Sequence, residues 1–449
     1  MEAAALRTVF ETVLPLETIN DAVVRLGVQK RQRSLDPVKL LFSLVLMGGT
    51  SECGRLAAVV RDYFRRGGKE VVAGAYYKWF DDELLALMRE LSDNALTYVE
   101  QMRPHLPGIL SGRRDWRAVD STVVKLRDEL IGEWPGTGTY AALKVHKVYS
   151  LGVENVVAYH ITPARRHDGP ELTIDETWRG MGLIVDLGYA GFQLLQACQA
   201  HDVHIVVRLK DGWKVYLDDS VKPEVKRTWV GVTPEQRDGK ADFELTESEL
   251  LDVDVTVGPP EASVPMRLVG VPLDREYGLF LTSVPRNTHS AVEVGELYRL
   301  RWSIEIDNKL AKSGCQLDEI TAEKPVSAEI LVHAAMLASI LANAIAHLDA
   351  VAQGAVGSRT VRLKRPPIHA LILWKCIVAA ASDLAALLAN PATTNKDWAH
   401  SASFLTAGGA DRNWKLKPSP IDRVKGRTAS GRAWRSPATG HAAEDSHAK

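Results

Sequence analysis

Cysteine is scarce in this 449-residue sequence. Its four cysteines lie far apart, at Cys53, Cys198, Cys315 and Cys376, and no two of them form a Cys-x-x-Cys pair. This spacing argues against cysteine-based zinc motifs and against a disulfide framework. Such sparse cysteine is typical of a reducing compartment, and we expect a cytoplasmic protein.

The sequence also lacks an excess of charge of either sign. It has 55 Lys or Arg and 56 Asp or Glu, a formal net charge of −1, so the chain as a whole is not attracted to nucleic acid. A nucleic-acid surface would require local clusters of basic residues. Such clusters occur at residues 30–33 and 61–69, and over residues 401–449, where nine Lys or Arg accompany four Asp or Glu. A basic cluster is more often an ordinary solvated surface.

Membrane signals are absent as well. The N-terminus lacks the basic-then-apolar pattern of a signal peptide. The most apolar stretch, Ile330 to Leu348, is interrupted by four polar residues: His333, Ser339, Asn343 and His347. We therefore expect a buried helix there rather than a membrane span, and no membrane partner.

Residues 1–110 have the pattern of short helices joined by glycine turns. Pro37 suits the first turn of a helix, and further helices are expected over Glu52 to Arg66 and Asp81 to Met102. Arginines near the ends of such helices are compatible with a helix-turn-helix module that binds DNA. A helical domain without DNA contact fits the same pattern.

From Asp115 onward the pattern favours strands. Runs rich in β-branched residues occur at Trp116–Leu126, Lys144–Leu151 and Asn155–Thr162, and they predict an antiparallel meander. A helical stretch around Glu171 to Gly180 leads to the apolar run Leu183 to Val185, which predicts a fourth strand. Another helix and a fifth strand, over 192–200 and 204–209, complete a β-β-β-α-β-α-β order. That order predicts an α/β fold with a mixed sheet and helices on its faces.

The rest of the chain divides by composition. Residues 210–286 alternate short β-like pieces with Pro, Gly and acidic turns, which predicts a β-rich insertion. A long helix is expected from about Ala291 to Ser313, followed by apolar helices at 326–350 and 368–390. We therefore divide the chain into an all-helical N-terminal domain, a two-part core around the insertion, and a C-terminal helical region with a basic tail. The N-terminal domain covers 1–110, the core covers 111–209 and 287–350, the insertion between its parts covers 210–286, and the C-terminal region covers 351–449.

Four polar residues of the long helix stand on one side of it. At 100° per residue, Tyr298, Arg301, Glu305 and Lys312 fall within a 60° arc, next to an apolar stripe. A carboxylate in such a line is held rigidly and has cations on both sides to meet an anionic polymer. A solvated helix surface would also explain the pattern. The spacing Tyr-x2-Arg-x3-Glu-x6-Lys should arise by chance in roughly one such protein in several hundred.

This spacing resembles the YREK signature of the insertion-sequence-four family of DDE transposases. Three further segments match that family in order: Asp120-Ser121-Thr122 at the end of the first strand, Asp186-Leu187-Gly188-Tyr189, and the strand Leu279 to Pro285. The resemblance covers roughly residues 115–315. Leu187 departs from it, because many relatives have a basic residue there.

The resemblance implies a ribonuclease-H-like fold with a catalytic centre of Asp120, Asp186 and Glu305. These carboxylates would bind two Mg²⁺ ions, with Mn²⁺ as a substitute, and Asp120 would bridge the ions. Two such ions stabilise both the attacking and the leaving oxygen of a phosphoryl displacement. Taken singly, each aspartate could simply end a strand or cap a turn.

The function implied is DNA transposition: excision of a mobile element at its terminal inverted repeats and its joining to target DNA. The expected partners are double-stranded DNA and a second copy of the chain in a synaptic dimer, at the nucleoid. Two alternatives stay open. One is a ribonuclease-H-like nuclease that cuts without joining, and the other is an inactive derivative that only binds DNA.

The resemblance also implies DNA contacts around the carboxylates. Tyr298, Arg301 and Lys312 would bind phosphates near the element's end. A hairpin intermediate would need an aromatic platform for a flipped base, for which Tyr277 is the candidate. Trp213 and Trp229 are its rivals, and packing would explain all three. His146, His160 and His167 follow or lie on strands, and we assign them no catalytic role.

Overall fold

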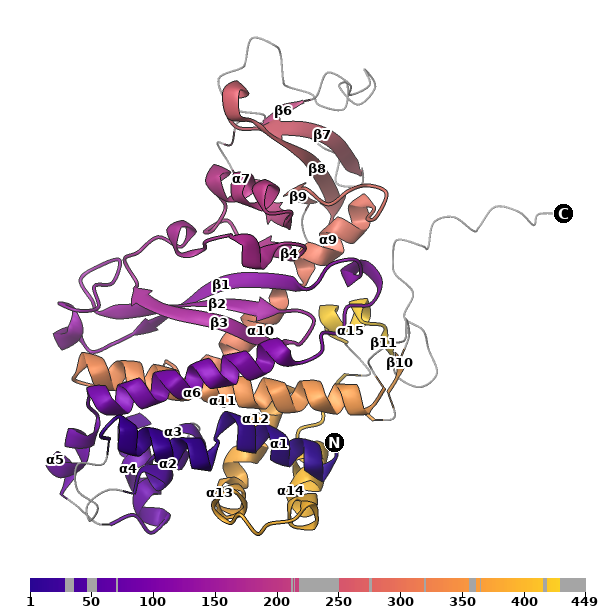
Figure 1. Cartoon of the computed structure of the whole chain (residues 1–449). Coiled ribbons are helices and arrows are strands. Elements are labelled where there is room, and N and C mark those ends of the chain that lie inside the picture. The colour runs from indigo at the N-terminus through magenta and orange to yellow at the C-terminus, as the bar shows by residue number, and fades with distance from the viewer. Residues whose placement is uncertain are drawn as a thin grey trace.

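The computed structural model shows a mixed α/β protein built on one large sheet (Figure 1). It describes residues 1–28, 36–46, 55–69, 72–210, 213, 215–217, 250–273, 277–318, 320–354, 361–363, 365–414 and 418–428. The basic cluster at 30–33, Trp229 and the chain from 429 onward lie outside these residues.

The sheet has nine strands in the order β3-β2-β1-β4-β5-β9-β8-β7-β6. Their bounds are β1 Trp116–Lys125, β2 Ala142–Ser150, β3 Asn155–Pro163, β4 Gly182–Val185, β5 His204–Arg208, β6 Val215–Leu217, β7 Leu251–Val257, β8 Val264–Pro272 and β9 Tyr277–Thr282; a separate two-stranded sheet pairs β10 (Val361–Arg362) with β11 (Arg427–Thr428). β1 runs antiparallel to β2 and parallel to β4, β4 is parallel to β5, and β5 is antiparallel to β9. All four residues of β4 are buried, as expected for a central strand covered on both faces.

The α-helices are α1 Ala3–Val13, α2 Leu16–Arg25, α3 Pro37–Leu46, α4 Arg55–Arg65, α5 Ala73–Tyr76, α6 Asp82–Gln101, α7 Phe192–Ala200, α9 Ala291–Arg299, α10 Trp302–Lys309, α11 Pro325–Ala352, α12 Ala370–Ala379, α13 Ala381–Ala389, α14 Asn395–Gly408 and α15 Pro420–Val424. Short 3₁₀ turns occur at η1 Tyr77–Trp79, η2 Gly108–Leu110, η3 Asp128–Leu130, η4 Gly169–Glu171, η5 Glu176–Trp178 and η6 Pro260–Ala262, and η7, Leu310–Gly314, is a π-helical turn. Within 1–110, the described residues form helices and turns without a strand.

The helix α11 is the centre of the helical layer. In Figure 1 it lies with α6 between β1–β3 and the lower helices. Its length and apolar composition would suffice to cross a membrane, but 94% of its most apolar window is buried inside the protein. The prediction of a buried helix is therefore confirmed. The single helix predicted over 368–390 is wrong: Ala380 has φ −93° and ψ 7°, which breaks it into α12 and α13, bent by 71°.

The segment predicted as a β-rich insertion supplies strands to this sheet. Its described residues form β6 to β9, and β9 returns to pair with β5 through Val207↔Leu281. Apolar residues alternate along β7, so that one face is buried against α7 and its neighbours. The sheet therefore continues without a break from β3 to β6.

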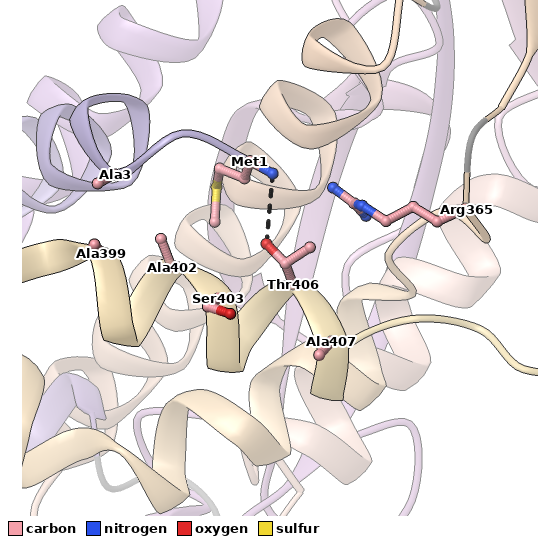
Figure 2. A pocket seen from close by; sticks show the side chains of 8 residues that line it. All are labelled: Met1, Ala3, Arg365, Ala399, Ala402, Ser403, Thr406 and Ala407. Carbon is pink, nitrogen blue, oxygen red and sulfur yellow. Dashed lines mark hydrogen bonds between the residues drawn. The ribbon is translucent and has the colours of Figure 1, made fainter.

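The N-terminus packs on the side of α11 away from the sheet. The Met1 amino group lies 3.0 Å from Oδ1 of the fully buried Asp349 and donates to Oγ1 of Thr406 on α14 (Figure 2). Arg365 pairs with the same carboxylate. Two cations thus neutralise a buried anion, as burial of a charge requires. The pocket in Figure 2 is lined by Met1, Ala3, Arg365 and residues of α14. It therefore lies on the side of α11 away from the sheet (Figure 1).

Candidate active site

Asp120 lies where β1 extends beyond the end of its parallel neighbour, β4. The last paired residues of these strands are Val119 and Val185, so Asp120 and Asp186 are the next residues on two adjacent strands. The prediction that Asp120 ends its strand is wrong, because β1 continues to Lys125 by pairing with β2 alone. Asp120 is partly buried, and its Oδ2 accepts a hydrogen bond of 2.9 Å from Nδ2 of Asn308 on α10.

Asp186 begins the loop after β4. Its Oδ1 accepts a hydrogen bond of 2.9 Å from the backbone N–H of Gly188. A Cβ at position 188 would lie 3.2 Å from that oxygen and 3.1 Å from Oδ2 of Asp168, so the glycine gives the loop its close approach. Leu187, the departure from the family pattern, is 38% exposed.

Glu305 lies on α10, which contacts β1. The structure corrects the single helix predicted over Ala291 to Ser313. Between α9 and α10 the chain tightens into 3₁₀ bonds, with the N–H groups of Arg301 and Ile304 each bonding three residues back. After Lys309 the helix widens into the π-helical turn η7. The position of Lys312 is therefore no longer given by a helical wheel of 100° per residue. Arg301 and Glu305 still face each other, with Nη2 to Oε1 at 2.5 Å.

Electrostatics places the three carboxylates together. Burial, then the negative charge of Asp186 and, to a smaller extent, that of Glu305 together raise the pKa of Asp120 to about 6. Arg301 opposes this shift. Each of these groups is therefore close enough to Asp120 to act on its proton. The site is an acidic cluster balanced by one guanidinium.

This donor set fits divalent metal ions of the magnesium type. Three carboxylates supply hard oxygen ligands, and their mutual repulsion, seen in the raised pKa of Asp120, is what a divalent cation would relieve. Glu305 is engaged by Arg301, so binding an ion requires that carboxylate to share or leave its partner.

The other predicted site residues occupy different surroundings. The Tyr298 ring packs on Phe280 of β9 at 4.7 Å between centroids, and the Arg301 guanidinium lies 5.8 Å above that ring. Lys312 is half-buried in η7. Tyr277 opens β9 and lies over Gly270, where a Cβ would meet its hydroxyl at 2.5 Å. Trp213 is partly buried against the core around β4 and β5.

Comparison with known proteins decides the family. Residues 111–341, just over half of the chain, match the model described as "Transposase DDE domain". The chain belongs to the DDE transposase family. Membership implies the use of divalent metal ions.

Individual relatives agree with this family. The chain is 42% identical over 67 residues to the transposase for insertion sequence element IS421 of Escherichia coli, covering 15% of this chain and 18% of that protein. It is 22% identical over 272 residues to the transposase for IS231D of Bacillus thuringiensis subsp. finitimus, covering 51% and 55%. The chain thus spans about half the length of that second relative, and much less of the first.

A solved structure also resembles the chain. It is the piggyBac transposase synaptic complex with hairpin DNA, with a TM-score of 0.44 and 11% identity, covering 93% of this chain and 89% of that one.

In this DDE transposase-family protein, the candidate site has neighbours to which the sequence assigned no role. On the face of the sheet away from α10, Asp168 accepts hydrogen bonds of 2.9 Å from Ser121 Oγ and from Lys144 Nζ. The Tyr189 hydroxyl lies 2.9 Å from Nδ1 of His146. Ser121 and Tyr189 directly extend the two aspartate motifs, and that adjacency was the available signal. Asp168 has none, since its loop is placed by tertiary structure alone.

A buried ion pair fixes α10 above β1 and β2. Lys147 of β2, directly opposite Asp120, donates to Oδ2 of Asp307 at 2.5 Å, and Asn343 of α11 donates to Oδ1 at 2.7 Å. The ammonium is fully buried and the carboxylate nearly so. Asp307 lies two residues after Glu305, so this pair also determines where Glu305 is held.

The raised pKa of Asp120 predicts a pH-dependent stability in the metal-free protein. The folded-state value of about 6 exceeds the ordinary 3.8, so the stabilisation from this group is full below pH 3.8 and is lost as pH rises through about 6. Asp120→Asn removes the group. We expect it to gain about 2–3 kcal/mol over wild type between about pH 4 and pH 7, measured by urea unfolding with chelator. A difference independent of pH would contradict the assignment.

Proposed function

We propose that this member of the DDE transposase family cuts DNA at the terminal inverted repeats of a mobile element and joins the cut ends to target DNA. The observation that carries the proposal is the meeting of Asp120, Asp186 and Glu305 beside Arg301, where the parallel pairing of β1 with β4 ends. The order β3-β2-β1-β4-β5, antiparallel then parallel, supports a ribonuclease-H-like class. The spacing from Tyr298 to Lys312 supports a place in the insertion-sequence-four family with its YREK signature.

The three carboxylates share one task in this proposal, which is to bind metal ions. Asp120, Asp186 and Glu305 would hold two Mg²⁺ ions, or Mn²⁺ in their place. Such ions, when bound, stabilise the attacking and leaving oxygens of an in-line displacement and activate water or a 3′-hydroxyl. The amide of Asn308 orients Asp120, and the N–H of Gly188 orients Asp186. Both constraints reduce the rearrangement needed before reaction.

Arg301 exchanges one anion for another. In the metal-free chain it neutralises Glu305 at 2.5 Å and lies over the Tyr298 ring. If Glu305 held a metal ion, the guanidinium beside the Tyr298 ring would be freed from its partner and could bind a DNA phosphate. Arginine suits this because its planar donors match phosphate oxygens.

The wider DNA contacts extend the same idea. Tyr298 and Lys312 would bind phosphates close to the element's end, and Tyr277 would stack on a flipped base. Tyr277 is partly buried, whereas Trp302, which directly follows Arg301, is 55% exposed. Trp302 is therefore more accessible than Tyr277 for stacking on a base. Trp302 therefore joins Tyr277 as a candidate platform. The partners are double-stranded DNA and, in the synaptic complex, a second copy of the chain, within the cytoplasm at the nucleoid.

The decisive experiment follows the DNA products. The purified chain is incubated with Mg²⁺ and DNA carrying the element's own ends, and with pre-cut ends plus target DNA. We expect cleavage at the ends and a joined product, both lost with chelator and with Asp186→Ala. Cleavage without joining would identify a nuclease, and binding without either product an inactive derivative. Equal cleavage by wild type and Asp186→Ala would contradict the mechanism.

A further inference from the structure

Two histidines and a glutamate form a cluster behind Asp120, on the face of the sheet away from α10. His146 of β2 and His160 of β3 are directly paired across the strands, and their rings stack at 4.7 Å with 11° between planes. Among the residues that the structure describes, one ligand atom from each of His146, His160 and Glu171 lies within 4.8 Å of the others. We propose that these three residues bind a divalent transition-metal ion of the zinc type, at a site separate from the catalytic carboxylates.

The donor set selects the kind of ion. Two imidazoles and one carboxylate are ligands that Zn²⁺ and its neighbours prefer, whereas Mg²⁺ prefers oxygen alone. His160 Nε2 and Glu171 Oε2 are 3.1 Å apart, close to the edge of about 3.3 Å in a tetrahedron with bonds of about 2.0 Å. Three protein ligands leave a fourth position for water. The cluster therefore differs in chemistry from the site of Asp120.

His146 is in the state that a metal ligand needs. Burial lowers its pKa to about 4, so the ring is neutral at neutral pH. Its two nitrogens contact the hydroxyls of Tyr189 and Thr162, each at 2.9 Å. A hydroxyl can turn to another partner, so either nitrogen can be released to an ion. The side chain of His160 is 47% exposed, which gives an ion a path from solvent to the cluster.

The surrounding charges permit a cation. Lys144 is paired with Asp168, whose Oδ1 also lies 3.7 Å from Nδ1 of His146. Arg166 contacts Glu171 at 3.3 Å, but it is 64% exposed and can swing into solvent when an ion takes its place. Asp168 and Glu171 then offset the added charge.

The ion would act on the catalytic site through one turn. Glu171 ends η4, and Asp168 immediately precedes it. Asp168 holds Ser121, the residue after Asp120. A metal ion joining Glu171 to β2 and β3 would therefore fasten this turn and keep Asp168 on the strand that carries the first catalytic aspartate. The ion is structural in this arrangement and takes no part in the displacement.

Cobalt substitution tests the proposal without relying on activity. The full-length chain is stripped of metal and titrated with Co²⁺, whose visible absorption reports tetrahedral coordination, and Zn²⁺ is then used to displace it. We expect His160→Ala and Glu171→Gln each to weaken Co²⁺ binding about 100-fold or more. His201→Ala is the matched control, since His201 and Glu176 form a surface pair at 3.5 Å outside the cluster. It should bind as wild type does.

The catalytic variant Asp120→Asn separates the two sites. Binding of Co²⁺ with an unchanged spectrum in Asp120→Asn supports the proposal, and its loss there would assign the ion to the carboxylates instead. Absence of a tetrahedral spectrum in wild type, or its retention in both His160→Ala and Glu171→Gln, would overturn the proposal. Circular dichroism of the metal-free variants checks folding, and Glu171→Gln, which keeps the size of the side chain, keeps the test valid if His160→Ala unfolds.

Discussion

Glu305→Gln is expected to lower the rate of Mg²⁺-dependent end cleavage by at least about 10³-fold while leaving the protein folded. The amide keeps the size of the side chain but removes the negative charge that a metal ion requires. Glu305 lies on the surface of α10 with 29% of its side chain exposed, so its replacement disturbs little packing. Single-turnover cleavage of DNA carrying the element's ends measures the effect.

The matched control is Glu296→Gln on the preceding helix, α9. It makes the same chemical change nine residues away and should cleave at the wild-type rate. DNA binding by Glu305→Gln should be retained or become tighter, because Arg301 loses its anionic partner and is free for phosphate. A Glu305→Gln protein that cleaves normally would remove Glu305 from the mechanism.

Asp307→Ala is expected to lower the free energy of unfolding by about 3–5 kcal/mol, the largest effect on stability that we predict. It leaves the Lys147 ammonium, which is fully buried, without its partner. The Nδ2 group of Asn343 also loses its acceptor. Urea unfolding followed by circular dichroism gives the change as a shift of the midpoint.

Two comparisons show whether the cost comes from the unpaired charge. The double variant Lys147→Met with Asp307→Leu removes both charges and should cost clearly less than Asp307→Ala alone. Glu11→Ala breaks a surface pair with Arg7 and should cost less than about 1 kcal/mol. Equal stability of Asp307→Ala and wild type would show that the buried pair contributes nothing. Reduced cleavage by a folded Asp307→Ala would show that it also positions Glu305.

Local patterns predicted the elements of the site better than their shape. Runs rich in β-branched residues predicted β1 to β3, and the apolar run Leu183 to Val185 predicted β4, which is buried along its whole length. The helical wheel predicted that Arg301 and Glu305 share a side, and they do. It could not predict the 3₁₀ step before Ile304 or the π turn at Leu310, since a wheel assumes a constant rotation per residue.

Long-range contacts account for what the sequence concealed. Asp120 lies in mid-strand because β1 is longer than β4, and the relative length of two strands far apart along the chain is set by the fold. Asp168 reaches Ser121 from a loop, and Asn308 reaches Asp120 from a helix, and the two share no sequence motif. His146 and His160 are visible in the sequence, but their pairing depends on the register of β2 and β3.

The return of β9 beside β5 separates the length of a segment from the geometry of the site. After Arg208 the chain continues to β6 at the far edge of the sheet and returns through β7 and β8 to β9, which runs antiparallel to β5. The N–H of Leu209 is bonded to the carbonyl of Leu279 at 2.9 Å. The segment between Leu209 and Leu279 therefore has its two ends next to each other, beside β5. Closing such a loop costs little more when it is longer. This segment can therefore be enlarged, shortened or exchanged among relatives without moving Asp186 or Glu305.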